Sequence, residues 1–246
     1  MIFHAFQITL DHFYRGKVIV KQHRSGYRFS IDAPLLADFL PHAPLAEALE
    51  IGTGSGIISL LAQYHGKFKF IRALEIQPRL CRLAKQNVRL NHMGGKIRVI
   101  HGDFSKVYAR HRGIQIVFSN PPYRKTTGGH LSPNREIRLA KTETALDLET
   151  VVMKSATVIH HDGCLCLILP ADRRDELMRL CEAAGLFITR WRDIQSFADG
   201  KPERFLVQLS AKQRDTARMK PLVLFIKPGE YTSEAEKILS GNRHAD

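Results

Sequence analysis

The fold is decided by one stretch of the chain, Ala48–Gly56, which has the sequence ALEIGTGSG. It reads as an apolar strand that enters a glycine turn, and the apolar run Ile57–Ala62 then predicts a helix. Glycines let the backbone turn tightly and approach a ligand closely. The spacing G-x-G-x-G differs from that of dinucleotide binders, and no Lys-Ser or Lys-Thr pair follows it, so nicotinamide and triphosphate ligands are disfavoured. Alone, the stretch predicts either a ligand cradle or a plain strand-to-helix turn.

Two acidic residues follow the next two predicted strands and favour the ligand cradle. Glu75 ends the strand Phe70–Glu75, where a carboxylate can accept both hydroxyls of a ribose. The alternative for this residue is a strand-end or helix-capping acid. Asp103 and Phe104 follow the strand Ile97–His101, where Asp can accept from an adenine amine while Phe packs on the ring. The alternative there is an ordinary turn Asp beside a core Phe.

A tetrapeptide after a third apolar run adds a chemistry to this ligand site. Asn120, Pro121, Pro122 and Tyr123 directly follow the run Ile114–Ser119. An amide-like nitrogen is a poor nucleophile, and two acceptors that hold both of its N–H bonds turn the lone pair toward an electrophile. The Asn side-chain oxygen and a Pro carbonyl are two such acceptors, and Pro has no N–H to compete. The ring of Tyr123 offers a flat target a surface for stacking.

The order of glycine turn, Glu, Asp and Asn-Pro-Pro-Tyr resembles the class I methyltransferases that use S-adenosylmethionine, and specifically their amino-methylating branch. In more detail the chain resembles the bacterial tRNA1(Val) adenine-37 N6-methyltransferase family, from roughly Phe13 to Leu239. The stretches that carry this resemblance are Tyr27–Ala37, Glu50–Gly56, Asn120–Tyr123, Asn134–Glu136 and Tyr231–Ala235.

The resemblance implies a Rossmann-like α/β fold, mostly parallel with helices on both faces and an antiparallel edge. It also implies direct transfer of a methyl group to the N6 amine of a tRNA adenine, with Asn120, Pro121, Pro122 and Tyr123 holding the amine. The implied cofactor-binding residues are Glu50, Gly52, Thr53, Gly54, Gly56, Glu75, Ile76, Asp103, Phe104 and Asn120. Glu50 stands where the family often has Asp, whose side chain is one methylene shorter. Glu50 is therefore expected to contact the methionine end of the cofactor, but with a different geometry.

Charge independently favours a nucleic-acid partner. The 246 residues hold 37 Lys and Arg against 24 Asp and Glu, which gives a net charge of +13 at pH 7. A group of basic residues follows the tetrapeptide and is expected to contact RNA phosphates: Arg124, Lys125, Arg135, Arg138 and Lys141. A second basic run, Lys212–Lys220, reads as a hairpin loop that either touches RNA or is only solvated.

Composition and periodicity predict one globular α/β unit, because 44% of the residues are hydrophobic and strands alternate with helices. The pattern predicts helices over Pro78–Met93, capped by Gly94, and over Leu148–Ile159, followed by the strand Cys164–Leu169. Three late strands, separated only by loops, are expected to have antiparallel neighbours: Phe187–Ile194, Arg204–Leu209 and Leu222–Phe225.

The N-terminal part is expected to add a hairpin to this unit. Val18–Val20 and Tyr27–Phe29 would be its strands around the polar Gln22–Gly26. Asp32 reads as a helix cap, with a wall of the cofactor pocket as the alternative. The expected organisation is therefore an N-terminal extension over 1–40, a methyltransferase domain over 41–240 and a frayed tail over 241–246.

Cysteines and histidines show no pattern typical of a disulfide framework or a metal site. The four cysteines, Cys81, Cys164, Cys166 and Cys181, fall inside predicted helices or strands and are expected to be buried thiols. The pair His160-His161 is expected to favour a helix C-terminus rather than bind metal. No signal peptide or membrane-length apolar run is visible, so a cytoplasmic location is expected.

Three other functions fit parts of the sequence. A ribosomal RNA base amine or a glutamine side chain of a translation factor could be the methyl acceptor, since the same tetrapeptide suits both. An RNA-binding module without catalysis is the third, although the complete set of motifs argues against it. The sequence leaves open the oligomeric state and the RNA elements that are recognised.

Overall fold

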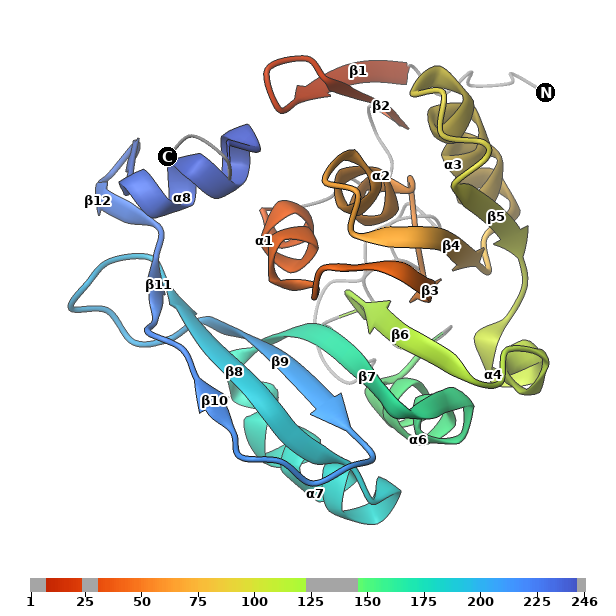
Figure 1. The fold of residues 1–246 in the computed structure, drawn as a ribbon. Coiled ribbons are helices and arrows are strands. Elements are labelled where there is room, and N and C mark those ends of the chain that lie inside the picture. The colour runs from red at the N-terminus through yellow and green to blue at the C-terminus, as the bar shows by residue number, and fades with distance from the viewer. Residues whose placement is uncertain (1–7, 24–30, 123–145, 243–246) are drawn as a thin grey trace, which may run out of the picture.

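The structure is a computed structural model, and it describes residues 8–23, 31–122 and 146–242. A nine-stranded sheet forms its centre (Figure 1). The strands are β3 (Ala43–Ile51), β4 (Phe68–Glu75), β5 (Ile97–His101), β6 (Ile114–Ser119), β7 (Ile159–Pro170), β8 (Phe187–Gln195), β9 (Arg204–Ser210), β10 (Ala217–Arg218) and β11 (Leu222–Val223). Their order is β10-β8-β9-β7-β6-β3-β4-β5, and β11 also pairs with β8.

The sheet is mostly parallel, as the sequence predicts. Strands β5, β4, β3, β6 and β7 pair in parallel, and β9 lies antiparallel between β7 and β8. Most of these strands are buried on both faces, which explains their continuous apolar runs, such as Cys164–Leu169 in β7. The predicted α/β class is confirmed.

Helices cover both faces of the sheet. One face packs against α1 (Asp32–Phe39), α2 (Ile57–Tyr64), α3 (Pro78–Leu90) and α8 (Ser233–Ser240). The other packs against α4 (Phe104–Val107), α6 (Leu148–Val158) and α7 (Arg174–Ala184), and short 3₁₀ turns span Tyr108–Arg110 and Ala171–Arg173. The predicted helix at Leu148 is confirmed, except that Ile159 already begins β7.

The predicted end of the helix that starts at Pro78 is wrong. α3 ends at Leu90 with Asn91 as its C-cap, and His92 takes the left-handed conformation at φ +56°. The sequence placed this role on Gly94, because Gly is the usual residue there. Asn91 ends the helix earlier: its side chain is hydrogen-bonded to the backbone of Ile19, with Nδ2 2.7 Å from the carbonyl oxygen.

The N-terminal hairpin exists but lies earlier in the chain than predicted. Its strands are β1 (Ile8–Phe13) and β2 (Val18–His23), joined through Tyr14, Arg15 and Gly16 at positive φ. Tyr27–Phe29, the predicted second strand, lies outside the described residues. The true turn was missed because its first two residues are not of the usual turn type.

Two asparagines of α3 attach this hairpin to the domain. Asn91 bonds the backbone N–H and carbonyl of Ile19, and Asn87 does the same for Lys21 at 2.8 and 3.0 Å. Asn87 also donates to the carbonyl of Ser55, in the glycine turn, at 2.9 Å. The hairpin is thus tied to the glycine turn through one buried side chain.

The C-terminal strands depart from the prediction. β8 and β9 are antiparallel as expected, but β10 and β11 pair in parallel with β8. Leu222 faces Ile194 in this register. β10 and β11 run opposite in direction to β9, but β8 lies between them and β9, so the neighbour that they pair with is parallel. The basic run Lys212–Lys220 is therefore not the predicted hairpin loop.

A small hairpin, β12 (Phe225–Lys227) and β13 (Glu230–Tyr231), then leads into α8. α8 ends at Gly241, which takes φ +73° and lies against the ring of Tyr14. The first and last described elements of the chain are therefore in contact.

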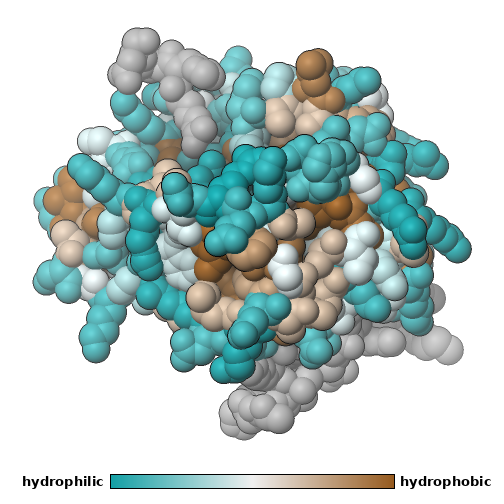
Figure 2. Space-filling model, turned by 60° about the horizontal axis from the view of Figure 1, so that its bottom comes forward, coloured by the Kyte–Doolittle hydropathy of each residue, from teal (hydrophilic) through white to brown (hydrophobic). Residues whose placement is uncertain are grey.

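The surface is mainly hydrophilic on the side drawn in Figure 2, where hydrophobic residues line a central hollow and also appear near the left and upper margins. No helix within the described residues is both long and apolar enough to cross a membrane. All four cysteines are buried and free, as predicted.

Candidate functional site

The carboxyl ends of β3, β4, β5 and β6 bring the predicted site residues to one edge of the sheet. In open α/β sheets this edge is where ligands bind. The turn after β3 is tied to its neighbours: Thr53 N–H donates to the carbonyl of Leu74 at 2.8 Å, and Ser119 Oγ donates to that of Ile51 at 2.8 Å. The motifs therefore sit on strand ends that are fixed relative to one another.

The glycine turn needs its glycines for conformation and for space. Gly52, Gly54 and Gly56 have φ of +72°, +60° and +88°, which side chains rarely adopt. A Cβ on Gly56 would lie 3.4 Å from Cβ of Ala84 in α3. The turn thus brings unobstructed backbone to the start of α2.

Glu75 holds this turn from the end of β4. Its side chain is buried, Oε2 accepts from Gly54 N–H at 2.8 Å, and Oε1 accepts from Gln77 N–H at 2.7 Å. Glu75 joins the glycine turn to the turn that contains Ile76.

Glu50 is a buried carboxylate directly before the turn. Its Oε2 accepts from Thr53 Oγ1 at 2.6 Å and from Ser59 Oγ. Its Oε1 is buried and has no hydrogen-bond partner within the described residues. Burial is the main cause that raises the pKa of Glu50 to about 7, hydrogen bonds from Ser59 and Thr53 lower it, and the charge of Glu75 raises it.

Ser59 also belongs to this site, although no sequence motif predicted it. It lies in α2, where the signal available was one Ser within the apolar run Ile57–Ala62. A buried hydroxyl usually requires a partner, so such a Ser could have indicated a polar group nearby.

Asp103 and Phe104 both have local structural roles. Asp103 caps α4, with Oδ1 accepting from Ser105 N–H at 3.0 Å and from Ser105 Oγ at 2.7 Å. Phe104 is buried, and its ring centroid lies 6.3 Å from that of Tyr108. These contacts match the turn-and-core alternative, and the cofactor role of the pair stays a prediction.

Asn120, Pro121 and Pro122 follow β6 at the same edge, next to the end of β3. Asn120 is half-buried and Pro121 is buried. Tyr123 lies outside the described residues, as do all the basic residues predicted downstream of it: Arg124, Lys125, Arg135, Arg138 and Lys141.

Asp32 is not the cap of α1, and this prediction is wrong. The N-cap is Ile31, while Asp32 is the first helical residue and has a buried side chain. Its Oδ1 lies 2.9 Å from Nε of Arg204, which faces Pro170 at the carboxyl end of β7. An ion pair across two elements replaces the local cap.

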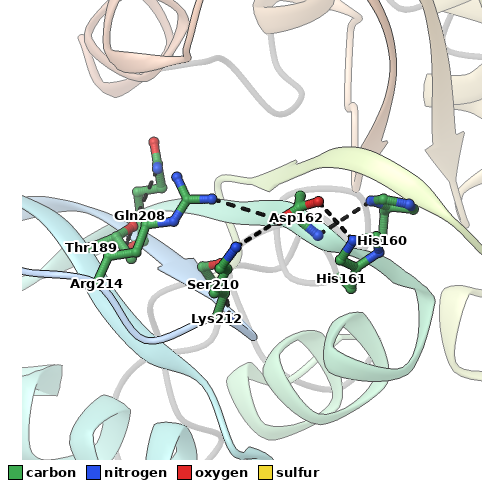
Figure 3. Close-up of polar contacts among 8 residues, drawn as sticks. All are labelled: His160, His161, Asp162, Thr189, Gln208, Ser210, Lys212 and Arg214. Carbon is green, nitrogen blue, oxygen red and sulfur yellow. Dashed lines mark hydrogen bonds and ion pairs between the residues drawn. The ribbon is translucent and has the colours of Figure 1, made fainter.

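A polar cluster lies at the opposite, amino-terminal end of β7 (Figure 3). Possible ligand atoms of His160, His161 and Asp162 lie within 4.8 Å of one another. Lys212 Nζ and Arg214 Nη2 lie 3.5 and 3.8 Å from Oδ1 of the same Asp162. Two cations beside the carboxylate oppose a divalent ion, and the cluster instead holds the basic run on β7.

Sequence comparisons agree with the predicted resemblance. Residues 47–128 match the family model described as TRM5/TYW2 methyltransferase domain. A protein from a Flavobacteriaceae bacterium (strain 3519-10), named tRNA1(Val) (adenine(37)-N6)-methyltransferase, is 25% identical over 89% of this chain and 92% of its own length. A protein of the same name from Tolumonas auensis is 28% identical over 80% of this chain and 82% of its own length.

Solved structures share the fold. A predicted O-methyltransferase from Agrobacterium tumefaciens superposes with a TM-score of 0.65 at 17% identity, covering 85% of this chain and 95% of that one. A tRNA m1G37 methyltransferase from M. jannaschii superposes with a TM-score of 0.60 at 16% identity, covering 86% of this chain and 59% of that one. These structures confirm the Rossmann-like fold. The sequence relatives confirm the predicted resemblance and methyltransferase as the class of enzyme.

Proposed function

We propose that this protein transfers a methyl group from S-adenosylmethionine to the N6 amine of an adenine in tRNA, at position 37 of the anticodon loop of tRNA1(Val). One observation carries the proposal: Asn120, Pro121 and Pro122 follow β6 at the sheet edge that also bears the glycine turn and Glu75. An amine-binding loop beside a nucleoside cradle is the arrangement that methyl transfer to an amine requires. The curated relatives carry the name of this activity. The proposal includes a cytoplasmic location.

The residues present fit the cofactor. The left-handed glycines Gly52, Gly54 and Gly56 leave backbone open to a ligand. Glu75 lies at the end of β4 beside the glycine turn, where a carboxylate can accept the two hydroxyls of a ribose. The unpartnered Oε1 of Glu50 suits the ammonium of the methionine end, since a buried acceptor is costly without a donor.

The adenine of the cofactor is assigned to the end of β5. Oδ1 of Asp103 is used by Ser105, and Oδ2 lies 3.7 Å from Nζ of Lys106. An exposed contact of that length leaves Oδ2 able to accept from an exocyclic amine. Phe104 and Ile76 are also assigned to the adenine site. Because the ring of Phe104 is buried, it would form the floor of that site.

When bound, the cofactor supplies an electrophilic methyl group on a positively charged sulfur. The chain's own task is to orient the acceptor. The side-chain oxygen of Asn120 and a backbone carbonyl of the Pro-Pro segment would accept the two N–H bonds of the target amine, which directs the nitrogen lone pair away from them. Tyr123 is proposed to stack on the target base, and Arg124, Lys125, Arg135 and Arg138 to contact its phosphates.

No strong base is needed in this scheme. The methylated nitrogen becomes more acidic as it gains positive charge, and the acceptors that hold its N–H bonds can stabilise it until solvent takes the proton. An anticodon-loop adenine suits such a pocket, because an unpaired base turns out of its stack at a smaller energetic cost than a paired one.

The test is methylation of unmodified tRNA followed by mass spectrometry of its nucleosides. We expect N6-methyladenosine at one position of tRNA1(Val), and none when that adenine is replaced by guanine. Ribosomal RNA fragments and a glutamine-containing release-factor domain serve as competing substrates at the same salt concentration. Methyl label in the protein domain and in none of the RNAs would overturn the RNA substrate while leaving the amine chemistry intact.

A further inference from the structure

The excess positive charge of this protein is concentrated in one part of the fold. Residues 66–113, which contain β4, α3, β5 and α4, hold 12 Lys and Arg against only two acids, Glu75 and Asp103. The other 198 residues hold 25 Lys and Arg against 22 acids. This part of the chain therefore carries +10 of the net charge of +13. It includes β5, the last strand on one side of the sheet, which Figure 1 shows beside α3.

The helix α3 presents this charge as a basic stripe, defined by Arg82, Lys85 and Arg89. All three side chains are exposed, while Leu80, Ala84 and Val88 on the opposite side are buried in the core. Positions three and four apart share one helix face, so the three cations follow each other along the surface. Within the described residues, none of the three makes an ion pair.

Arg89 lies in the last turn of α3 and favours the helix dipole, but Arg82 and Lys85 do not stabilise the helix in this way. α3 has no acidic residue, although acids in the first turn would favour the helix dipole and acids four residues away would offset the cations. Lys85 has like charges three residues before it and four residues after it, and such pairs weaken a helix. A ligand that carries many negative charges would offset the repulsion among these cations.

We propose that the basic stripe binds the phosphate backbone of the RNA substrate. This inference rests on the proposed function and assigns a surface to it. α3 begins at Pro78, three residues after Glu75, so the stripe starts beside the site edge and runs away from it. Its charges are about 4.5 and 6 Å apart along the helix axis, which suits successive phosphates of one strand.

The stripe is distinct from the basic residues downstream of the tetrapeptide. The residues downstream of the tetrapeptide follow β6 and are expected to guide the target base. α3 packs near β4 and β5, and β3 separates these strands from β6. Neighbouring sheet strands lie about 4.8 Å apart, so the two strands between β6 and β5 place α3 roughly 10 to 15 Å from the acceptor loop. A folded RNA can span both sites, and only the base at the loop need be read.

The test compares three variants of the full chain. The first carries Arg82→Gln, Lys85→Gln and Arg89→Gln, and the second, as control, carries Arg179→Gln, Lys201→Gln and Lys227→Gln, which are exposed and remove the same charge. The third carries Arg82→Lys and Arg89→Lys, which keeps the stripe charged. Binding of an unmodified tRNA1(Val) transcript is measured from 50 to 300 mM salt, together with methylation and the thermal shift caused by the cofactor.

We expect the first variant to lower the slope of log affinity against log salt by about two to three, or 0.7 to 0.9 for each lost phosphate contact. Its KM for tRNA should rise about 10- to 100-fold, with an unchanged thermal shift on adding the cofactor. The control and the Lys variant should behave as the parent does.

If the first variant has the same salt slope as the control while the parent methylates tRNA, the basic stripe does not bind RNA. The proposed function is then unaffected. A parent that neither methylates tRNA nor binds it in a salt-dependent way overturns both. Loss of the cofactor shift in the first variant but not in the Lys variant assigns α3 to folding and also overturns the proposal.

Discussion

Strands β3 to β6 carry the glycine turn, Glu75, Asp103 and Asn120, whereas β7 to β11 carry none of the residues assigned to cofactor or amine. The two regions also differ in charge, because the strong basic excess belongs to the first. In the first region, each strand is followed by a turn that presents polar groups at one edge. The second region mainly extends the sheet and closes the fold around α1 and α8.

Chemistry and architecture are therefore separable in this chain. Changes in β3–β6 should alter turnover or cofactor affinity without requiring loss of the fold. Changes in β7–β11 and in the termini should alter stability with little effect on the reaction.

The largest effect is expected for Asn120→Ala. It removes one acceptor of the reacting amine and should lower turnover by about 10² to 10³, with little change in cofactor affinity. The matched change in the second region is Gln195→Ala, whose side chain donates to the carbonyls of Phe197, Ala198 and Gly200. Single-turnover methylation of tRNA measures both, and we expect Gln195→Ala to retain near-parental turnover. Equal losses would remove Asn120 from the reaction.

A second large effect concerns Glu50 and pH. Its pKa is raised to about 7 in the folded protein from 4.5, so the folded state binds the proton more tightly than the unfolded state. Stability from this group is full below pH 4.5 and is lost as pH rises through 7, a change of up to about 3 kcal/mol. Glu50→Gln should remove this dependence.

Urea unfolding of the parent and of Glu50→Gln between pH 4.5 and 8 measures this pH dependence of stability. The two stability curves should diverge over that interval, with the parent falling relative to the variant. The cofactor should oppose this fall by supplying a cation beside Oε1. Parallel curves in the absence of cofactor would place the pKa of Glu50 near its ordinary value.

Glu75→Gln should weaken cofactor binding by about 10- to 100-fold, because hydrogen bonds to a charged group are worth about 1.5 to 3 kcal/mol. The control is Glu47→Gln, which changes an exposed ion pair with Arg72 on the neighbouring strand. Calorimetric titration compares the two, and an unchanged affinity in Glu75→Gln would exclude the ribose contact.

The first region was predictable from the sequence because its signals are local. Glu75 ends one short strand, Asp103 comes two residues after the next, and parallel strands place all such ends on one side of the sheet. The contacts of Ser59 and Asn87 were not predictable, because each depends on a partner that folding brings near. Charge was read from runs along the chain, and α3 was missed because its cations are separated by core residues.

The second region was less predictable because strand pairing there is a long-range choice. Leu222 pairs in parallel with β8, although the short loops suggested antiparallel neighbours. Asp32 finds Arg204, which is 172 residues away in the chain, instead of capping its own helix. Local sequence patterns predict a helix or strand, but they do not predict which strand it pairs with or which charged residue it contacts.

The smallest effect on turnover is expected at the contact that closes the fold. Gly241 has φ +73°, and a Cβ there would meet the ring of the buried Tyr14. Gly241→Ala should therefore destabilise by about 1 to 3 kcal/mol from overpacking, in addition to the cost of its positive φ. Gly185→Ala is the control, because Gly185 has φ +64° but nothing within 4 Å of the added Cβ, so it isolates the backbone cost. Thermal unfolding gives both values, and the excess for Gly241 measures how firmly α8 holds the N-terminal hairpin. Since neither glycine lies at the edge formed by the ends of β3 to β6, both variants should keep parental turnover at temperatures where they are folded. A fall in turnover for Gly241→Ala alone would show that the hairpin, which Asn87 ties to the glycine turn, transmits strain from the second region to the first.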